Sequence, residues 1–179
     1  MSIVITGTPG VGKHTISQMI AKDAVLDVID VNQIAAEAGL LRDSQGTGDV
    51  DTSELAEILK KHTTASSLIV GHLAPYAISP EQVKIVVVLR RNPYELIQTY
   101  KKRGYSTSKC MENAGSEVLG IIYHDAKNRF GEKTFQVESS EIYNTAKKVN
   151  DAICGRRGDD IDWLDVVTRN GDLKKFFAY

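Results

Sequence analysis

The chain has 179 residues, of which 42% are hydrophobic and 25% charged, and its formal net charge is −1. This length and balance are ordinary for one soluble globular domain with a sizeable core. The near-zero charge argues against a global field that would draw the chain to nucleic acid or to a membrane surface.

The two cysteines, Cys110 and Cys154, form no C-x-x-C motif and no metal-ligand cluster with the four histidines. We therefore expect reduced thiols in a cytoplasmic protein. The first residues enter a strand-like run without the basic stretch and cleavage site of a secretory signal. Apolar runs are much shorter than the roughly 20 residues that a membrane-spanning helix needs, so no membrane association is expected.

Short apolar runs alternate with segments of helical periodicity along the first half of the chain. In chain order they predict a strand at 2–6, a helix at 13–22, a strand at 25–30, helices at 31–38 and 52–62, and a strand at 66–70. Thr52 or Ser53 is a suitable N-cap for the third helix. The segments between, 40–51 and 71–80, have the composition of loops.

The second half begins with a continuous apolar run, which is typical of a strand buried on both faces. The predicted elements, in order, are a strand at 84–89, helices at 93–103 and 108–130, a strand at 134–137 and a helix at 139–154. Asn92 is the predicted N-cap before Pro93. Residues 155–160 resemble a linker. The tail at 161–179 is too apolar for disorder, so we expect it to dock on the domain or on a partner.

This alternation predicts an α/β fold with a parallel sheet and helices on both faces. Ligands of such sheets bind at the carboxyl ends of the strands. We expect the loops at 7–12, 71–80 and 90–92 to meet at that edge.

A phosphate-binding loop is the most informative motif. Gly7, Gly12 and Lys13 have the spacing G-x-x-x-x-G-K between the first strand and the first helix. Backbone N–H groups, the helix dipole and the lysine ammonium of such a loop attract phosphate oxygens. A chance glycine-rich turn is the alternative, which this setting disfavours. His14 stands where the motif has Ser or Thr, whose hydroxyl normally binds Mg²⁺, and Thr15 follows.

Further segments resemble one family together with this loop: residues 71–73 (Gly-His-Leu), 86–90, 102–109 with Arg-Gly-Tyr-Ser at its centre, Glu112, Asn113 and Glu117 downstream, and 161–164. The chain resembles the adenylate kinase isoenzyme 6 family, also called coilin-interacting nuclear ATPases. Within it, the chain is similar to the archaeal proteins named "putative adenylate kinase". The resemblance implies a P-loop fold of the nucleoside monophosphate kinase type, in three α/β/α layers with a five-stranded parallel sheet.

The resemblance also implies adenylate kinase activity, in which ATP and AMP give two ADP, with Mg²⁺ accompanying ATP. It further implies ATPase activity and a role in small ribosomal subunit (pre-16S/18S rRNA) maturation. That role would act through a small-subunit ribosomal protein, with only indirect contact to pre-ribosomal RNA. The alternatives are an assembly ATPase with little kinase activity, and a nucleotide-binding module with weakened catalysis.

The family's site residues are carried over position by position. The expected ATP-binding residues are Gly10, Val11, Gly12, Lys13, His14, Thr15 and Arg103, and the expected catalytic residues are Lys13, His72 and Arg103. No residue is assigned to a resident metal site. The resemblance implies a single kinase domain at 1–179, with a monophosphate-binding segment at 29–52, a lid at 101–111 and a docking tail at 159–179.

Position 70 departs from the family, which has an acid there, because this chain has Val70. Loss of that carboxylate is expected to weaken the organisation of Mg²⁺. Asp30 and Asp51 are both candidates to replace it.

Several assignments keep an alternative. Arg90 either neutralises phosphate or forms a structural salt bridge, and His72 either acts in the site or serves in capping and packing. Arg103 contacts ATP or stabilises a helix end. Arg42 is the candidate for binding the AMP phosphate, and Tyr105 is expected to pack within the lid.

Overall fold

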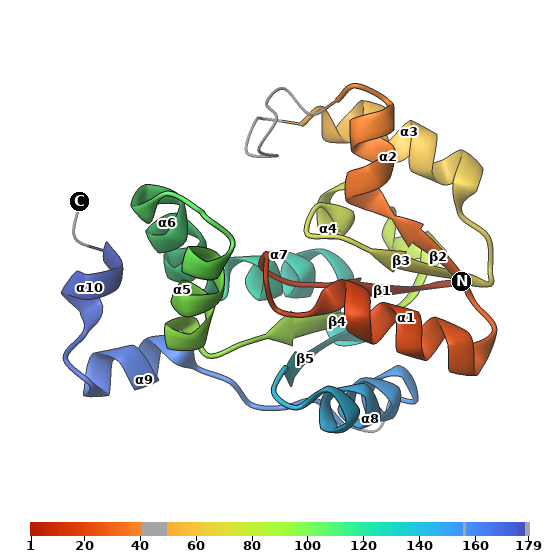
Figure 1. The fold of residues 1–179 in the computed structure, drawn as a ribbon. Coiled ribbons are helices and arrows are strands. Elements are labelled where there is room, and N and C mark those ends of the chain that lie inside the picture. The colour runs from red at the N-terminus through yellow and green to blue at the C-terminus, as the bar shows by residue number, and fades with distance from the viewer. Residues whose placement is uncertain (41–49, 156, 178–179) are drawn as a thin grey trace.

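The structure, a computed structural model, describes residues 1–40, 50–155 and 157–177. A five-stranded sheet runs through its centre in the order β2-β3-β1-β4-β5, with every adjacent pair parallel (Figure 1). The strands are β1 (Ser2–Thr6), β2 (Asp27–Asp30), β3 (Ser67–Val70), β4 (Val83–Arg90) and β5 (Thr134–Glu138). The predicted α/β class and parallel sheet are confirmed.

Helices cover both faces of this sheet, which makes three layers (Figure 1). The core on one face is formed with α1 (Lys13–Ala24), α5 (Pro93–Lys102), α6 (Thr107–Val118), α8 (Ile142–Ile153), α9 (Trp163–Arg169) and α10 (Leu173–Phe177). The core on the other face is formed with α2 (Val31–Glu37), α3 (Thr52–His62), α4 (Ala74–Ala77) and α7 (Ile121–Phe130). Short 3₁₀ turns, Pro80–Gln82 and Gly131–Lys133, lead into β4 and β5.

The apolar run of β4 explains how one strand serves both cores. Val87 and Leu89 point into the first core, whereas Val86 and Val88 point into the second, and all four are fully buried. Because successive side chains of a strand face opposite sides of a sheet, a strand between two helical layers is apolar at every position.

The predicted long helix at 108–130 is wrong, because the chain forms two helices there. Gly120, between α6 and α7, has a φ of 62°, and a Cβ atom there would lie 3.2 Å from Nη1 of Arg90. Only glycine adopts this left-handed conformation at such a close approach without strain. The helices therefore meet at an angle that a continuous helix could not provide.

Other differences concern caps and a loop. The predicted loop at 71–80 contains the short helix α4. Helix α3 is capped by Asp51, whose carboxylate accepts hydrogen bonds from the N–H groups of Ser53 and Glu54. Glu141 caps α8, which therefore begins at 142 rather than 139. The predicted cap of α5 by Asn92 is confirmed.

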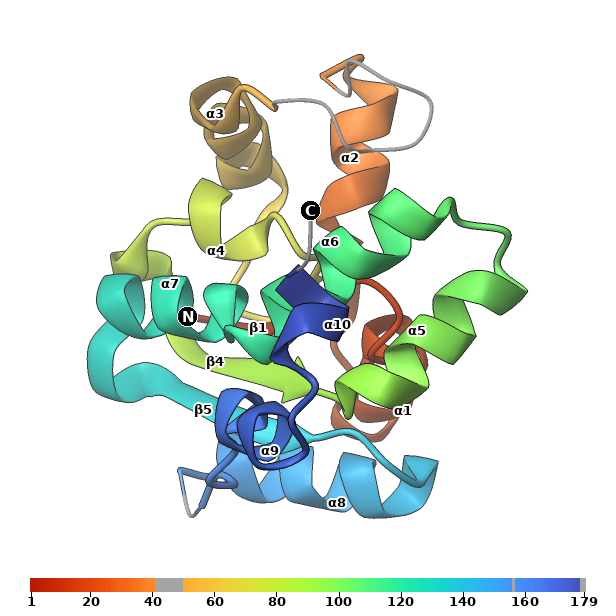
Figure 2. The same ribbon diagram turned by 90° about the vertical axis from the view of Figure 1, so that its left-hand side faces the viewer.

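The C-terminal helices α9 and α10 pack against α6. They lie on the side of the molecule that faces the viewer in Figure 2. Val167 and Phe176 are buried in the core, and the Phe176 ring meets the edge of the Tyr94 ring at a centroid distance of 5.3 Å. The Tyr94 hydroxyl donates to Asp172 at 2.8 Å. This tail is therefore an integral part of one helical layer.

Of the helices in the described part of the chain, none combines the length and apolar character that a membrane crossing requires.

Candidate functional site

The loop at 7–12 joins β1 to α1 at the carboxyl edge of the sheet. Gly7 has a φ of 137°, and a Cβ atom there would lie 2.3 Å from the carbonyl oxygen of Leu89. Only glycine lets the loop pass β4 so closely. The hydroxyl of Tyr100, on α5, donates to the carbonyl oxygen of Pro9 at 2.6 Å. Packing against neighbouring elements therefore holds the loop in shape.

Lys13 begins α1, and its side chain folds back beneath the loop. Its ammonium donates to the carbonyl oxygens of Gly7 at 2.8 Å and Thr8 at 3.0 Å, and only 5% of the residue is exposed. Burial lowers the pKa of Lys13 from its usual 10.5 to about 8, although the nearby Glu117 carboxylate opposes this shift. The loop thus holds a cation that a bound anion would stabilise in its charged form.

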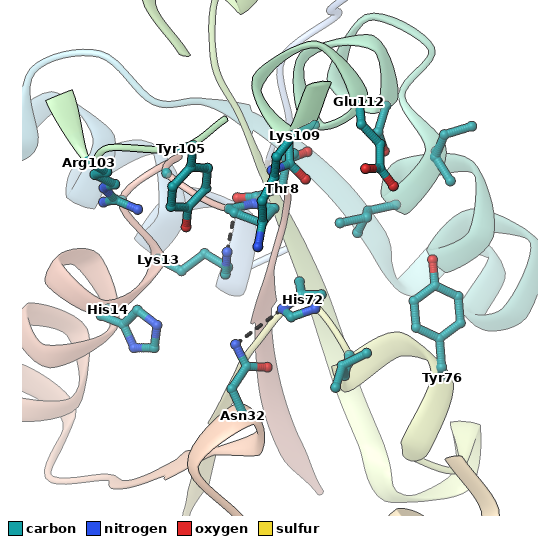
Figure 3. Close-up of a pocket in the computed structure, with 18 of the residues that line it drawn as sticks. Thr8, Lys13, His14, Asn32, His72, Tyr76, Arg103, Tyr105, Lys109 and Glu112 are labelled. Atoms are coloured by element: carbon teal, nitrogen blue, oxygen red, sulfur yellow. Dashed lines mark hydrogen bonds between the residues drawn. The ribbon is translucent and has the colours of Figure 1, made fainter. Parts of the chain in front are cut away.

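The loop opens into a cavity of about 550 Å³ (Figure 3). Its walls come from distant parts of the chain: the loop and the start of α1, α2, residues 72–76, the segment 103–109, α6 and the start of α7. The predicted site residues that line it are Gly10, Gly12, Lys13, His14, Thr15, His72 and Arg103. Val11 differs, because its side chain is fully buried in the core and only its backbone belongs to the loop.

His72 follows β3 and lies between Lys13 and Tyr76 in the cavity (Figure 3). Its Nδ1 atom lies 3.1 Å from the Nδ2 atom of Asn32, which can only donate, so Nδ1 accepts and Nε2 carries the hydrogen. Burial, together with the charge of Lys13, lowers the pKa of His72 to about 4. His72 is therefore a neutral imidazole at pH 7 with one N–H to donate.

Beneath the loop lies a buried polar cluster, formed by Thr8, Arg90, Glu117 and Gln136. One carboxylate oxygen of Glu117 accepts a hydrogen bond from the Thr8 hydroxyl. The other accepts from Nε of Arg90 at 2.8 Å and from the N–H of Arg91 at 3.0 Å. Arg90 also donates to Oε1 of Gln136 at 2.9 Å and to the carbonyl oxygen of Glu117 at 2.8 Å. The cluster ties the loop to α6.

The expectation that Arg90 neutralises phosphate is wrong, and its alternative, a structural salt bridge, is correct. All three guanidinium nitrogens of Arg90 have partners, and the side chain is 3% exposed. The role of Glu117 escaped sequence reasoning. A signal was present, because Glu117 follows Cys110 and Ala114 at the spacing of one buried helix face.

The segment predicted as a lid lies beside the loop. Arg103 follows α5 and lines the cavity on the side of Lys13 (Figure 3). The Tyr105 ring stacks on the Tyr100 ring at a centroid distance of 5.5 Å, and the Lys109 ammonium lies 5.0 Å above Tyr105. Tyr105 thus packs within this segment while also lining the cavity.

The two candidate replacements for the acid at position 70 are far from equivalent. Neither carboxylate is itself among the residues that line the cavity. Asp51 is exposed at the start of α3, whereas Asp30 lies 3.3 Å from His14, which does line the cavity. Val70 itself is fully buried. Within residues 1–40, 50–155 and 157–177, no group of three or more His, Cys, Asp or Glu side chains could hold a metal ion. Arg42 lies outside the described residues.

A parallel sheet in the order 2-3-1-4-5, with a glycine-rich loop between β1 and α1, defines the fold of the P-loop kinases. The model of the AAA domain family matches residues 3–120. Two proteins named "Putative adenylate kinase" align over nearly the whole chain. The protein of Pyrococcus abyssi is 32% identical over 93% of both chains. That of Saccharolobus islandicus is 30% identical over 92% of this chain and 88% of its own. The chain belongs to the family of these two relatives.

Solved structures agree on the fold. A gluconokinase from Sinorhizobium meliloti has a TM-score of 0.60 and 16% identity, covering 86% of this chain and 91% of its own. A shikimate kinase from Aquifex aeolicus has a TM-score of 0.55 and 14% identity, covering 87% of this chain and 97% of its own. At these identities the likeness concerns the fold alone.

Proposed function

We propose that this protein is an adenylate kinase, which transfers the γ-phosphate of ATP to AMP and releases two ADP. The names of its relatives support a kinase of nucleotides. The observation that carries the proposal is the extent of the cavity lining, which reaches from the phosphate-binding loop to a second group of residues around Tyr76, Glu112 and Ile122. We call the parts of the cavity beside these two groups the donor half and the second, or acceptor, half. Hydrolysis of ATP needs room only for water beyond the γ-phosphate, whereas an acceptor nucleotide needs such a second half.

The donor half would bind the phosphates of ATP through the N–H groups of the loop and the ammonium of Lys13. Arg103 would add charge from the lid side. Mg²⁺ would arrive with ATP, because it binds phosphates and keeps several waters. Oxygen donors that suit it are present, namely the Thr15 hydroxyl on the cavity wall and the buried Oδ1 of Asn32, which accepts no hydrogen bond from the described residues. When bound, the ion neutralises phosphate charge.

The acceptor half has the composition that a nucleoside requires. Leu73, Tyr76 and Ile122 make an apolar wall, and Glu112 and Asn113 of α6 face it with polar groups. Tyr76 and Glu112 stand on opposite sides of this half in Figure 3. The buried Nδ2 of Asn113 has no acceptor among the described residues. An unpaired buried donor is costly, so a ligand atom that accepts from it would gain affinity and selectivity.

His72 lies at the junction of the two halves (Figure 3). Phosphoryl transfer needs positioned donors more than proton transfer, since charge spreads over the equatorial oxygens of the moving group. The neutral imidazole would donate its Nε2 hydrogen to such an oxygen. Closure of the lid at 101–111 would exclude water, which favours transfer over hydrolysis.

The test is ADP production by the purified protein from ATP alone and from ATP with each of four nucleoside monophosphates. The proposal predicts that AMP accelerates ADP formation strongly. Lys13→Ala should abolish this activity, whereas Lys22→Ala, at the exposed end of the same helix, should leave it unchanged. No acceleration by any monophosphate would contradict the proposal.

The family resemblance also supports an ATPase role in small-subunit maturation, and the same assay addresses it. An assembly ATPase predicts ADP formation that is independent of AMP and rises when the small-subunit ribosomal protein is added. A binding module without catalysis predicts nucleotide binding in calorimetry and no ADP in any arm.

A further inference from the structure

We propose that Asp30 has taken over the task of the acid missing at position 70, and holds the hydrated Mg²⁺ of bound MgATP. This inference rests on the proposed function, because it concerns the metal that accompanies ATP. It assigns one residue of β2 to a role that Val70, on β3, has no polar atom to perform.

Strand register places Asp30 where it can do so. In the parallel pair of β2 and β3, Asp30 is the direct partner of Val70. Both therefore stand at the same height, at the carboxyl edge of the sheet where the phosphate-binding loop lies. A carboxylate at position 30 is displaced from one at position 70 by a single strand, which is about 4.8 Å. A water molecule in the shell of the ion can bridge such a displacement.

The side chain of Asp30 is oriented, and one of its oxygens lies beside the first turn of α1, which follows the loop. Its Oδ1 accepts from the N–H groups of Asn32 at 2.9 Å and Gln33 at 3.3 Å, which fixes the carboxylate at the start of α2. Its Oδ2 lies 3.3 Å from Nδ1 of His14, the residue that follows Lys13. The Asp30 side chain is 25% exposed, so Oδ2 can reach water.

His14 explains why a carboxylate is needed at this place. An imidazole nitrogen is a poor ligand for Mg²⁺, which prefers oxygen, so position 14 lacks the usual metal-binding hydroxyl. His14 can instead orient Asp30 through Nδ1, as imidazoles and carboxylates near metal ions commonly orient each other. The departure from the motif at position 14 and the departure from the family at position 70 therefore both concern the role of Asp30.

Other carboxylates are less suitable. Glu117 also acts on the charge of Lys13, as Asp30 does, but it is 1% exposed and both of its oxygens are engaged. Asp51 caps α3, and its hydrogen bonds go to Ser53 and Glu54 of that helix rather than to a residue beside the loop. Glu112 lines the cavity, but in the acceptor half and away from His14 (Figure 3). Of these four carboxylates, Asp30 is the one whose second oxygen lies beside His14 at the start of α1.

The test compares the binding of a non-hydrolysable ATP analogue in saturating Mg²⁺ and in EDTA, by calorimetry, for the intact chain and for Asp30→Asn. Asparagine caps helices as well as aspartate, so this change leaves the start of α2 intact. Asp51→Asn is the matched control, since it makes the same change at the cap of α3. Loss of an outer-shell partner typically lowers metal affinity by about 10- to 100-fold.

The proposal predicts that Mg²⁺ tightens analogue binding to the intact chain and to Asp51→Asn equally. In Asp30→Asn this gain should shrink by about tenfold or more, with affinity in EDTA within about threefold of the intact chain. An unchanged gain in Asp30→Asn, or a loss seen in Glu112→Gln instead, would overturn the inference and leave the proposed function standing. Absence of analogue binding in every condition would overturn the proposed function itself.

Discussion

Lys13 gives the phosphate end of the cavity a pH dependence. Burial sets its pKa at about 8, so its ammonium is charged at about pH 7 and mostly neutral at about pH 9. Since the charged ammonium attracts phosphate and the neutral amine does not, the affinity for a non-hydrolysable ATP analogue should fall about tenfold between about pH 7 and pH 9. Calorimetric titrations at these pH values measure the change. Equal affinity at both values would mean that the pKa of Lys13 lies near 10.5.

At this scale the motif predicts some site residues and not others. The spacing of the motif was enough to predict Lys13 and Thr15 as site residues, because the backbone of the loop fixes where they lie. The family resemblance was needed to predict Arg103. Glu117 could not, since its role depends on Thr8 and Arg90, which are far from it in the chain. A carboxylate in a helical pattern indicates a solvated residue unless its buried partners are known.

The buried polar cluster that ties the loop to α6 should contribute strongly to stability. Glu117→Ala would leave Arg90 buried without its carboxylate, which costs about 3–5 kcal/mol of unfolding free energy. Glu95→Ala, the control, removes the ion pair with Arg91 at the surface and an acid in the first turn of α5, and should lower stability by at most about 1 kcal/mol. Urea denaturation of both variants measures these differences. A loss for Glu117→Ala as small as that of the control would refute a structural role for the cluster.

Docking of α10 should also be measurable. Phe176 is 3% exposed and packs on Tyr94, so Phe176→Ala should cost about 3–5 kcal/mol, as large-to-small core changes do. In a chain of this size that lowers the Tm by roughly 6 °C or more. Leu173→Ala, on the same helix but 38% exposed, should lower the Tm far less. If the two variants have the same Tm, the packing of Phe176 does not contribute to the stability of the core.

The types of the helices and strands were more predictable than the places where a helix ends. All five strands were identified from the sequence. In β1, β3 and β4 the apolar residues are buried at nearly every position, as in a strand between two helical layers, whereas polar residues interrupt β2 and β5. The helical pattern at 108–130 concealed the break, since Gly120 is tolerated within a helix at a modest cost. Its conformation follows from contact with Arg90, a residue of β4 that the local pattern does not include.

Across the whole molecule, the sheet order decides which segments meet. The carboxyl edge of a parallel sheet was predictable as the place of the site, and the loop, His72 and Arg103 do converge there. The pairing of Asp30 with Val70 could not be predicted from the sequence, because strand register depends on tertiary packing. The second half of the cavity likewise arises from α4, α6 and α7, which only the fold brings together.

We propose that this second half holds the acceptor nucleotide of a kinase, and the fate of the γ-phosphate tests this proposal directly. The protein is incubated with ATP labelled at the γ-phosphate and with unlabelled AMP, and the products are separated. We predict that the label appears in the β-phosphate of ADP and that AMP is consumed in equal amount. Label released as inorganic phosphate, at the same rate with and without AMP, would contradict the proposed transfer.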